Sequence, residues 1–212
     1  MLDGNLRRRH FIAAVLGGSY GPVRAARERT IVVVGDSLSA EYGLARGSGW
    51  VALLEKRLAQ QKIPAKVVNA SISGDTTSGG RSRVPALLAQ HKPDVVIIEL
   101  GGNDALRGLP LAMTQDNLAH MTEDAQKAGA RVLLVGVQVP PNYGADYSNR
   151  FAALFGQVAK ARKAAFVPSI MAGFGDAADA QRWFQADRIH PVAQAHSKML
   201  DNVWPELKKL LA

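Results

Sequence analysis

The chain contains no cysteine among its 212 residues. This absence excludes disulfide bonds, thiolate metal sites, a cysteine nucleophile and a lipid-modified N-terminal cysteine. It does not identify the cellular compartment, because exported proteins need not carry disulfides. Hydrophobic residues make up 47% of the chain and charged residues 21%, which is typical of a soluble globular protein. With no internal repeat and no linker, the chain is expected to form one domain.

The chain also lacks any block of five or more like charges. Its formal net charge is +8, but residues 1–25 contain four arginines and one aspartate, so the remainder of the chain carries only about +5. The other basic residues are scattered along the sequence. We therefore expect a solvated, mildly basic surface and no nucleic-acid partner.

Residues 1–25 have the layout of a secretory signal peptide. Arg7-Arg8-Arg9 precedes a short apolar segment at 11–18, and a region of small residues follows that suits cleavage after Ala25. The arginines also resemble the twin-arginine export signal. The apolar segment is too short to span a bilayer. We predict a signal peptide at 1–25, a folded domain at 26–212, and a periplasmic or secreted protein without stable membrane insertion. A disordered or helical leader on a cytoplasmic protein is the alternative.

Beyond this leader, short β-branched runs alternate with segments of helical periodicity. The expected strands are residues 31–34, 66–70, 94–100, 131–137 and 165–168. The expected helices lie between Ser48 and Pro64, between Thr76 and Pro93, and at 113–128, 147–163 and 191–211. This alternation indicates an α/β fold in which a parallel sheet carries helices on both faces.

Several residues are expected to mark the ends of these helices. Ser48 suits the N-cap of the first helix, and either Asp75 or Thr76 suits the N-cap of the second. Gly129 suits the position just past the third helix. Pro191 is expected in the first turn of the last helix.

The first strand runs directly into a Gly-Asp-Ser sequence, and Ser37 is its serine. Ligands of open α/β sheets bind just past the carboxyl ends of the strands. Ser37 is therefore the candidate nucleophile, provided that a base and a group that orients the base lie within reach. The alternative is a serine that caps the next helix.

An aspartate and a histidine in the loop after the fifth strand supply these groups. Asp187 precedes His190 by three residues, so one tight turn lets its carboxylate accept the Nδ1 proton of the histidine. Nε2 is then free to act as a base toward Ser37. The alternative is a surface aspartate beside a solvated histidine.

Two further residues are candidates for stabilising an oxyanion. Gly74 can present its backbone N–H at close approach, and Asn103 carries a neutral amide with two N–H groups. Either residue could instead serve only turn formation or capping. The loops after strands one, two, three and five leave the same edge of a parallel sheet, so these residues are expected to converge although they are distant in sequence.

At these positions the chain resembles the SGNH, or GDSL, hydrolases. Residues 35–39 match the serine block, residues 69–76 the glycine block, residues 101–104 the asparagine block, and residues 187–191 the final block. The four motifs occur in the family's order. Finer matches resemble the multifunctional branch of acyl-CoA thioesterase I, lysophospholipase L1 and arylesterase, and they lie at residues 39–44, 76–80 and 140–144.

This resemblance implies a flavodoxin-like three-layer α/β/α fold with a five-stranded parallel sheet. It implies a serine ester or thioester hydrolase that acts through an acyl-enzyme, with Ser37 as nucleophile, His190 as base and Asp187 as the residue that orients it. The oxyanion hole would consist of the Ser37 and Gly74 backbone N–H groups and the Asn103 side chain. No metal or cofactor is required.

The same resemblance suggests which residues bind the substrate, a small-molecule acyl ester or thioester. Leu106 and Leu109 lie in the loop expected to cover the acyl chain, and Pro141 lies in another matching loop. Arg188 stands where this branch often has glycine, and we expect it to leave catalysis intact but to bias substrate choice. We expect a monomer or weak dimer. The alternatives are a carbohydrate O-deacetylase on the same scaffold and a non-catalytic periplasmic binding protein.

Overall fold

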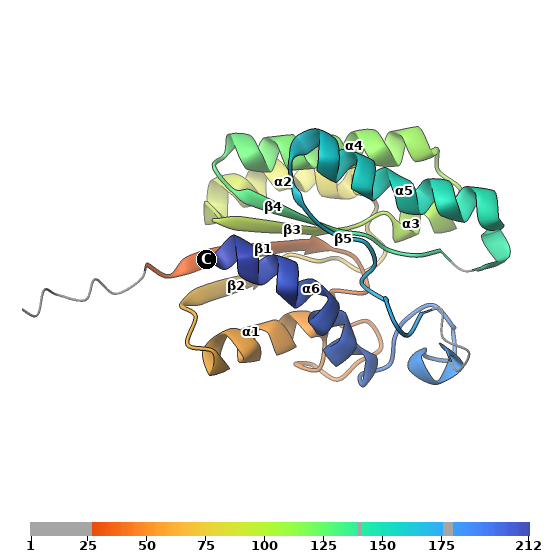
Figure 1. Cartoon of the computed structure of the whole chain (residues 1–212), viewed down its shortest axis with the longest axis horizontal. Coiled ribbons are helices and arrows are strands. Elements are labelled where there is room, and N and C mark those ends of the chain that lie inside the picture. The colour runs from red at the N-terminus through yellow and green to blue at the C-terminus, as the bar shows by residue number, and fades with distance from the viewer. Residues whose placement is uncertain (1–26, 140, 176–179) are drawn as a thin grey trace, which may run out of the picture.

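The computed structural model describes residues 27–139, 141–175 and 180–212, so the predicted signal peptide lies outside the described residues. Five parallel strands form one sheet in the order β2-β1-β3-β4-β5 (Figure 1). The strands are β1 (Arg29–Gly35), β2 (Ala65–Asn69), β3 (Val95–Glu99), β4 (Arg131–Val135) and β5 (Ala165–Val167). All five predicted strands are confirmed, with ends that shift by one or two residues.

Helices cover both faces of this sheet, as predicted. They are α1 (Trp50–Gln60), α2 (Thr77–His91), α3 (Gly102–Leu106), α4 (Leu111–Lys127), α5 (Ala145–Arg162) and α6 (Ala195–Leu211). Helices α1 and α6 pack together on one face, and α2, α4 and α5 cover the other (Figure 1). The strand order and the three layers match the predicted flavodoxin-like arrangement. Two short 3-10 helices, Pro141–Tyr143 and Ala180–Trp183, lie in the loops beside β4 and β5.

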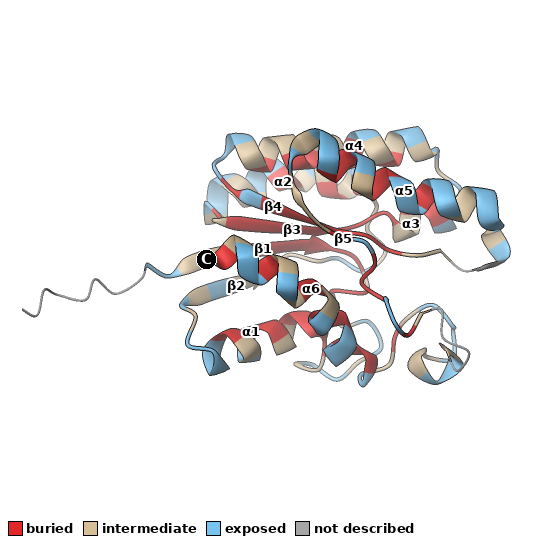
Figure 2. Cartoon of the chain, viewed as in Figure 1, coloured by how far each residue is buried: buried red, intermediate tan, exposed pale blue. Residues whose placement is uncertain are grey.

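The β-branched run at 31–34 lies at the centre of the sheet because both faces of β1 are covered. Each of its four side chains is at most 1% exposed, and all five residues of β3 are buried as well (Figure 2). Val33 is paired with Asn69 of β2 on one side and with Ile97 of β3 on the other. Such burial of unbroken apolar strands is typical of parallel sheets. It fixes the point at which the Gly-Asp-Ser sequence leaves the core.

The start of the first helix differs from the prediction. Ser48 does not cap α1: its hydroxyl donates to the Ala45 carbonyl, and Gly49 occupies the N-cap position without a side-chain hydrogen bond. The Trp50 N–H donates instead to Nδ1 of His196, a residue of α6. The partner is distant in sequence, which is why local pattern reading misses it. In contrast, Thr76 does cap α2, and Gly129 lies just past α4 with φ +87°.

The last helix also begins later than predicted, at Ala195 rather than Pro191. Pro191 forms an isolated antiparallel bridge with Phe184, and the Val192 N–H donates to the Trp183 carbonyl. These backbone hydrogen bonds hold the segment extended. Pro191 therefore does not begin the helix, although proline is common in a first helical turn. The short helix α3, directly after β3, was not predicted because five residues carry no clear periodicity.

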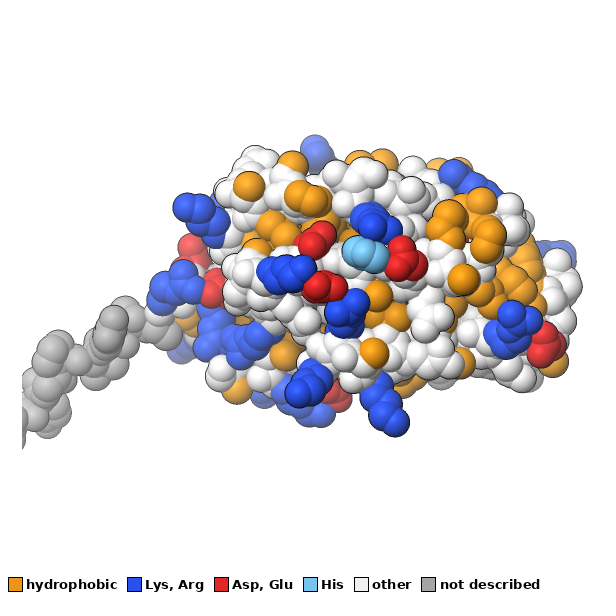
Figure 3. Space-filling model, turned by 90° about the horizontal axis from the view of Figure 1, so that it is seen from above, with side chains coloured by type: hydrophobic (Ala, Val, Ile, Leu, Met, Phe, Trp, Pro, Cys, Tyr) orange, Lys and Arg blue, Asp and Glu red, His pale blue; other side chains and the backbone are white. Residues whose placement is uncertain are grey.

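The outer face of α2, α4 and α5 carries charged side chains of both signs among apolar ones (Figure 3). Arg81 pairs with Asp116 at 2.9 Å, and Arg162 pairs with Glu123 at 2.9 Å. Charge on this face is therefore locally balanced rather than gathered into a patch of one sign. In the part of the chain that the structure describes, no helix is both long and apolar enough to cross a membrane.

Glu99 is an acid that lies within the core beside the start of the Gly-Asp-Ser segment. It is the last residue of β3 and is 0% exposed. Its Oε2 accepts the Ser39 hydroxyl at 2.6 Å, and its Oε1 has no hydrogen-bond partner among the described residues. The Trp50 indole N–H donates to the same hydroxyl at 3.1 Å. Burial, followed by the neighbouring Asp36 carboxyl, raises the pKa of Glu99 well above its ordinary value of 4.5. The folded protein therefore keeps a proton here that the unfolded chain loses.

Replacing Glu99 with glutamine should make stability less dependent on pH. Between pH 4.5 and the raised pKa, the wild type should lose up to about 1.4 kcal/mol of folding free energy per pH unit from this group as pH rises. Glu99→Gln keeps an acceptor for Ser39 and removes the proton. Urea unfolding of both proteins from pH 5 to 8 measures the difference, and parallel pH profiles would contradict the assignment.

Candidate active site

Three side chains from the carboxyl edge of the sheet form one hydrogen-bonded chain. Oγ of Ser37, two residues after β1, lies 2.9 Å from Nε2 of His190, and Nδ1 of His190 lies 2.7 Å from Oδ2 of Asp187. The segment that follows Ser37 forms turns rather than a helix, so the interpretation of Ser37 as a helix cap is wrong. The structure thus brings together the three residues that the sequence proposed as nucleophile, base and orienting acid.

The Asp187 carboxylate is held by the backbone of its own turn. Its Oδ1 accepts the N–H groups of Ile189 at 2.9 Å and of His190 at 3.0 Å. Burial acts to raise the pKa of Asp187, but these backbone hydrogen bonds and the His190 side chain outweigh it and lower the pKa below 3.8. An ionised carboxylate only accepts, so Nδ1 of His190 carries the proton and Nε2 is left to accept from Ser37.

Arg188 lies in the left-handed region of backbone conformation, with φ +59°. Glycine adopts this conformation without strain, whereas a residue with a Cβ atom such as arginine does not. The turn places Asp187 and His190 on the same side, and a left-handed residue between them closes it. The Arg188 side chain lines the cavity beside His190.

The expected oxyanion donors belong to three segments that follow neighbouring strands: Ser37 follows β1, Gly74 follows β2, and Asn103 lies in the short helix α3 after β3. Within the described residues, neither the Ser37 N–H nor the Gly74 N–H donates to a protein acceptor. Gly74 has φ +80°, a conformation that favours glycine. One N–H of the Asn103 amide donates to Oδ2 of Asp36 at 3.0 Å, which leaves the second available.

Asp36 is a functional-site residue whose part sequence reasoning did not assign. It is 2% exposed, and besides the Asn103 amide its carboxylate accepts the Leu38 N–H at 3.1 Å. Burial raises the pKa of Asp36 to about 6, against the lowering effect of these two hydrogen bonds. The acid therefore orients the Asn103 side chain from inside the protein. Its position between the buried strand and Ser37 was the available clue.

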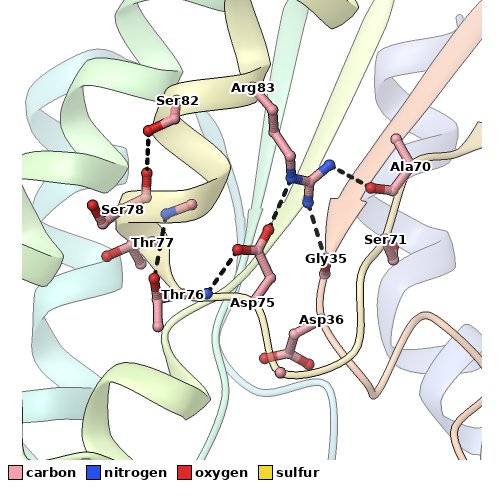
Figure 4. Close-up of polar contacts among 12 residues, drawn as sticks. Gly35, Asp36, Ala70, Ser71, Asp75, Thr76, Thr77, Ser78, Ser82 and Arg83 are labelled. Atoms are coloured by element: carbon pink, nitrogen blue, oxygen red, sulfur yellow. Dashed lines mark hydrogen bonds and ion pairs between the residues drawn. The ribbon is translucent and has the colours of Figure 1, made fainter.

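The half-buried guanidinium of Arg83 fixes the loop that carries Gly74 (Figure 4). Nε of Arg83 donates to Oδ2 of Asp75 at 2.8 Å, and the other nitrogens donate to the Ala70 carbonyl and, at 3.4 Å, to the Gly35 carbonyl. Gly35 ends β1 and Ala70 follows β2. One side chain therefore ties the exits of two neighbouring strands to the residue next to Gly74.

A cavity of about 300 Å³ opens beside these groups. Ser37, Asn103 and His190 line it, and most of the remaining wall is apolar. Its apolar side chains are Leu38, Leu106, Val137, Val139, Met171, Ala180, Phe184 and Ile189. Such a wall suits an aliphatic chain. Among the described residues, no group of three or more His, Cys, Asp or Glu side chains is arranged to hold a metal ion.

The structure places the three predicted substrate-binding residues differently relative to the cavity. Leu106 lines the cavity, Leu109 is not among its lining residues, and the side chain of Pro141 lies outside the described part of the structure. Leu109 instead follows α3, and its N–H donates to the Asp104 carbonyl. Sequence reasoning missed Val137 and Val139, although they follow β4 at the same edge of the sheet as the other loops.

Comparison with known proteins places this architecture among characterised hydrolases. A profile of the GDSL-like lipase/acylhydrolase family matches residues 33–198. Esterase TesA of Pseudomonas aeruginosa is 53% identical over 88% of this chain and 91% of its own length. Thioesterase 1/protease 1/lysophospholipase L1 of Escherichia coli strain K12 is 39% identical over 89% of this chain and 88% of its own length.

The fold agrees with these sequence matches. A crystal structure of TesA, 53% identical, superimposes with a TM-score of 0.82 over 86% of this chain and 99% of the other. The resemblance expected from the four motifs is therefore confirmed. Because the profile spans most of the chain and these relatives match it along nearly their whole length, the chain belongs to the GDSL-like lipase/acylhydrolase family and is a GDSL-type ester hydrolase.

Proposed function

We propose that Ser37 attacks the acyl carbon of an ester or thioester while Nε2 of His190 takes its proton, giving an acyl-enzyme. The observation that carries this proposal is the hydrogen-bonded chain from Ser37 through His190 to Asp187 at the wall of an apolar cavity. His190 returns the proton to the leaving oxygen or sulfur. Water then attacks the acyl-enzyme with the same base, which restores Ser37.

The negative charge that develops on the carbonyl oxygen needs donors already in place. The Ser37 and Gly74 N–H groups and the second Asn103 N–H serve this role in the proposed mechanism. Their support is the free state of both backbone N–H groups within the described residues, and the Asp36 carboxylate that holds the Asn103 amide. Asp187 keeps the imidazole in the required tautomer and stabilises its charged form.

The proposed substrates are acyl esters and thioesters with an aliphatic acyl chain, which the apolar wall suits better than an acetyl group alone. The names of the relatives support activity toward both ester types, because one is an esterase and another a thioesterase and lysophospholipase. A carbohydrate O-deacetylase remains the alternative. A series of p-nitrophenyl esters from acetyl to dodecanoyl, with acyl-CoAs and lysophospholipids, separates the two, since a deacetylase would act on acetyl esters alone.

We propose further that residues 1–25 are a signal peptide and that the enzyme acts in the periplasm or outside the cell as a monomer or weak dimer. The basic segment, the short apolar segment and the small residues before Ala25 support export. N-terminal sequencing of the protein from a periplasmic fraction tests it, and an intact N-terminus there would contradict cleavage at this position.

Ser37→Ala should lower kcat by about 10⁴-fold or more, because the nucleophile of a triad is indispensable. The rate of p-nitrophenyl butyrate hydrolysis measures the loss. A fluorophosphonate probe should label the wild type and leave the variant unlabelled, with unchanged thermal unfolding as control. Labelling of the alanine variant would place the nucleophile elsewhere.

Asn103→Ala should lower kcat about 10²–10³-fold while KM changes little, because a single oxyanion donor acts mainly in the transition state. Steady-state kinetics on the same ester, with circular dichroism to verify the fold, provide the measurement. A variant that kept its full kcat would remove Asn103 from the oxyanion hole.

Arg188→Gly should raise the free energy of unfolding by about 1 kcal/mol, because it relieves a left-handed non-glycine residue. It should also lower kcat/KM for an acyl-CoA relative to a p-nitrophenyl ester of the same acyl chain, because the cavity loses a cation that attracts phosphates. Arg188→Lys, which keeps the charge and the strain, is the matched control. An unchanged substrate ratio in the glycine variant would show that Arg188 does not bias the choice.

A further inference from the structure

An exposed aromatic ring lies against the histidine of the active site. The ring centroids of Tyr42 and His190 are 4.3 Å apart with an interplanar angle of 37°. Tyr42 is 50% exposed, so core packing does not explain its position. The His190 side chain is nevertheless only 17% exposed, while that of Asp187 is 37% exposed. The tyrosine thus provides part of the cover over the imidazole.

The backbone of Tyr42 is attached directly to the loop that carries His190. Nε2 of Gln185 donates to the Tyr42 carbonyl at 3.0 Å and to the Pro191 carbonyl at 3.1 Å. The Gln185 backbone N–H also donates to the His190 carbonyl at 2.8 Å. A single residue therefore connects the segment that follows Ser37 with His190 and with Pro191, the residue after it. This arrangement holds the tyrosine ring against the imidazole ring.

The residue after the tyrosine permits this close approach. A Cβ atom added to Gly43 would lie 2.2 Å from Oε1 of Gln185, and the residue has φ +70°. In addition, the Tyr42 N–H donates to the Ser37 carbonyl at 3.4 Å. The position of the ring is therefore tied to the nucleophile on one side and to the base on the other.

We propose that Tyr42, held by Gln185, is a positioning residue that fixes the His190 imidazole and stabilises its charged form. This inference rests on the proposed function. When Oγ of Ser37 bonds to the acyl carbon, its proton moves to Nε2 and His190 becomes an imidazolium. An aromatic face near that cation attracts it. When the leaving oxygen or sulfur takes the proton, the imidazole is neutral again, so Tyr42 itself gains and loses nothing.

Tyr42→Leu tests this role, because leucine keeps an apolar side chain but removes the ring. We expect kcat for p-nitrophenyl butyrate to fall about tenfold, with KM within about twofold of the wild type, since the contact matters most when His190 is charged. Tyr42→Phe should recover most of the lost kcat. Equal kcat in the leucine variant and the wild type, or no recovery with phenylalanine, would overturn the proposal.

Gln185→Met provides a second, independent test. It removes the side-chain hydrogen bonds to the Tyr42 and Pro191 carbonyls but does not change the tyrosine side chain itself. It should lower kcat by a similar factor, and the double variant with Tyr42→Leu should be little worse than either single variant. Such non-additivity is expected when two residues act through one contact. Fully multiplicative losses would contradict the proposed tether. Thermal unfolding of each variant verifies that the fold is retained.

The outcome for the proposed function is read separately. If the wild type neither hydrolyses the ester nor reacts with a fluorophosphonate at Ser37, the proposed function fails and the inference fails with it. If the wild type does both and Tyr42→Leu matches it in kcat and labelling rate, only the inference fails.

Discussion

Parallel pairing of the five strands fixes where the loops that carry the site residues begin. Because the strands run in the same direction, their carboxyl ends lie at one edge, and residues far apart in sequence leave the core there together. Ser37 follows β1 at a fixed point, since residues 31–34 are buried on both faces of the sheet. A one-residue slip of β1 would move each of these side chains to the opposite face. The geometry of the nucleophile is thus a consequence of the buried run before it.

Asp36 and Glu99, two buried acids beside the active site, lower the stability of the fold relative to apolar residues packed at the same positions. Asp36 and Glu99 are 2% and 0% exposed, and burial raises the pKa of both. Each accepts a hydrogen bond from a side chain near Ser37: Asp36 accepts from the Asn103 amide, and Glu99 accepts from the Ser39 hydroxyl. A polar network at the end of a hydrophobic strand thereby replaces part of the core and fixes the directions of side chains around Ser37.

The sequence predicts the fold and the convergence of Ser37, His190 and Asp187 because those inferences depend on local runs and on one topological rule. It also predicts a cap at Asp75 or Thr76, and the structure shows that Thr76 is the cap, through a contact within four residues. It cannot predict that His196 accepts the Trp50 N–H, because the two residues are 146 positions apart and meet only through the packing of α6 on α1.

Other parts of the site escape prediction for a similar reason. The tether from Gln185 to Tyr42 spans 143 positions, and the wall residues Val137 and Val139 show no chemical feature of their own. Leu109, predicted to bind substrate from its position in a loop, is not among the residues that line the cavity, because loop position does not fix which residues face it. Catalytic residues are therefore easier to predict from sequence than the residues that form the wall of the cavity beside them.

The two halves of the site are anchored to the sheet with unequal strength. Ser37 and Asn103 follow β1 and β3, which lie inside the sheet, whereas Asp187 and His190 follow β5, a three-residue edge strand that pairs only with β4. Local opening is easiest where few backbone bonds must break. Heating should therefore open the loop that carries the acid–base pair before the central strands separate, once the hydrogen bond from Gln185 to Tyr42 breaks. Loss of activity would then precede global unfolding. A melting temperature measured by circular dichroism would lie above the temperature at which the enzyme loses activity.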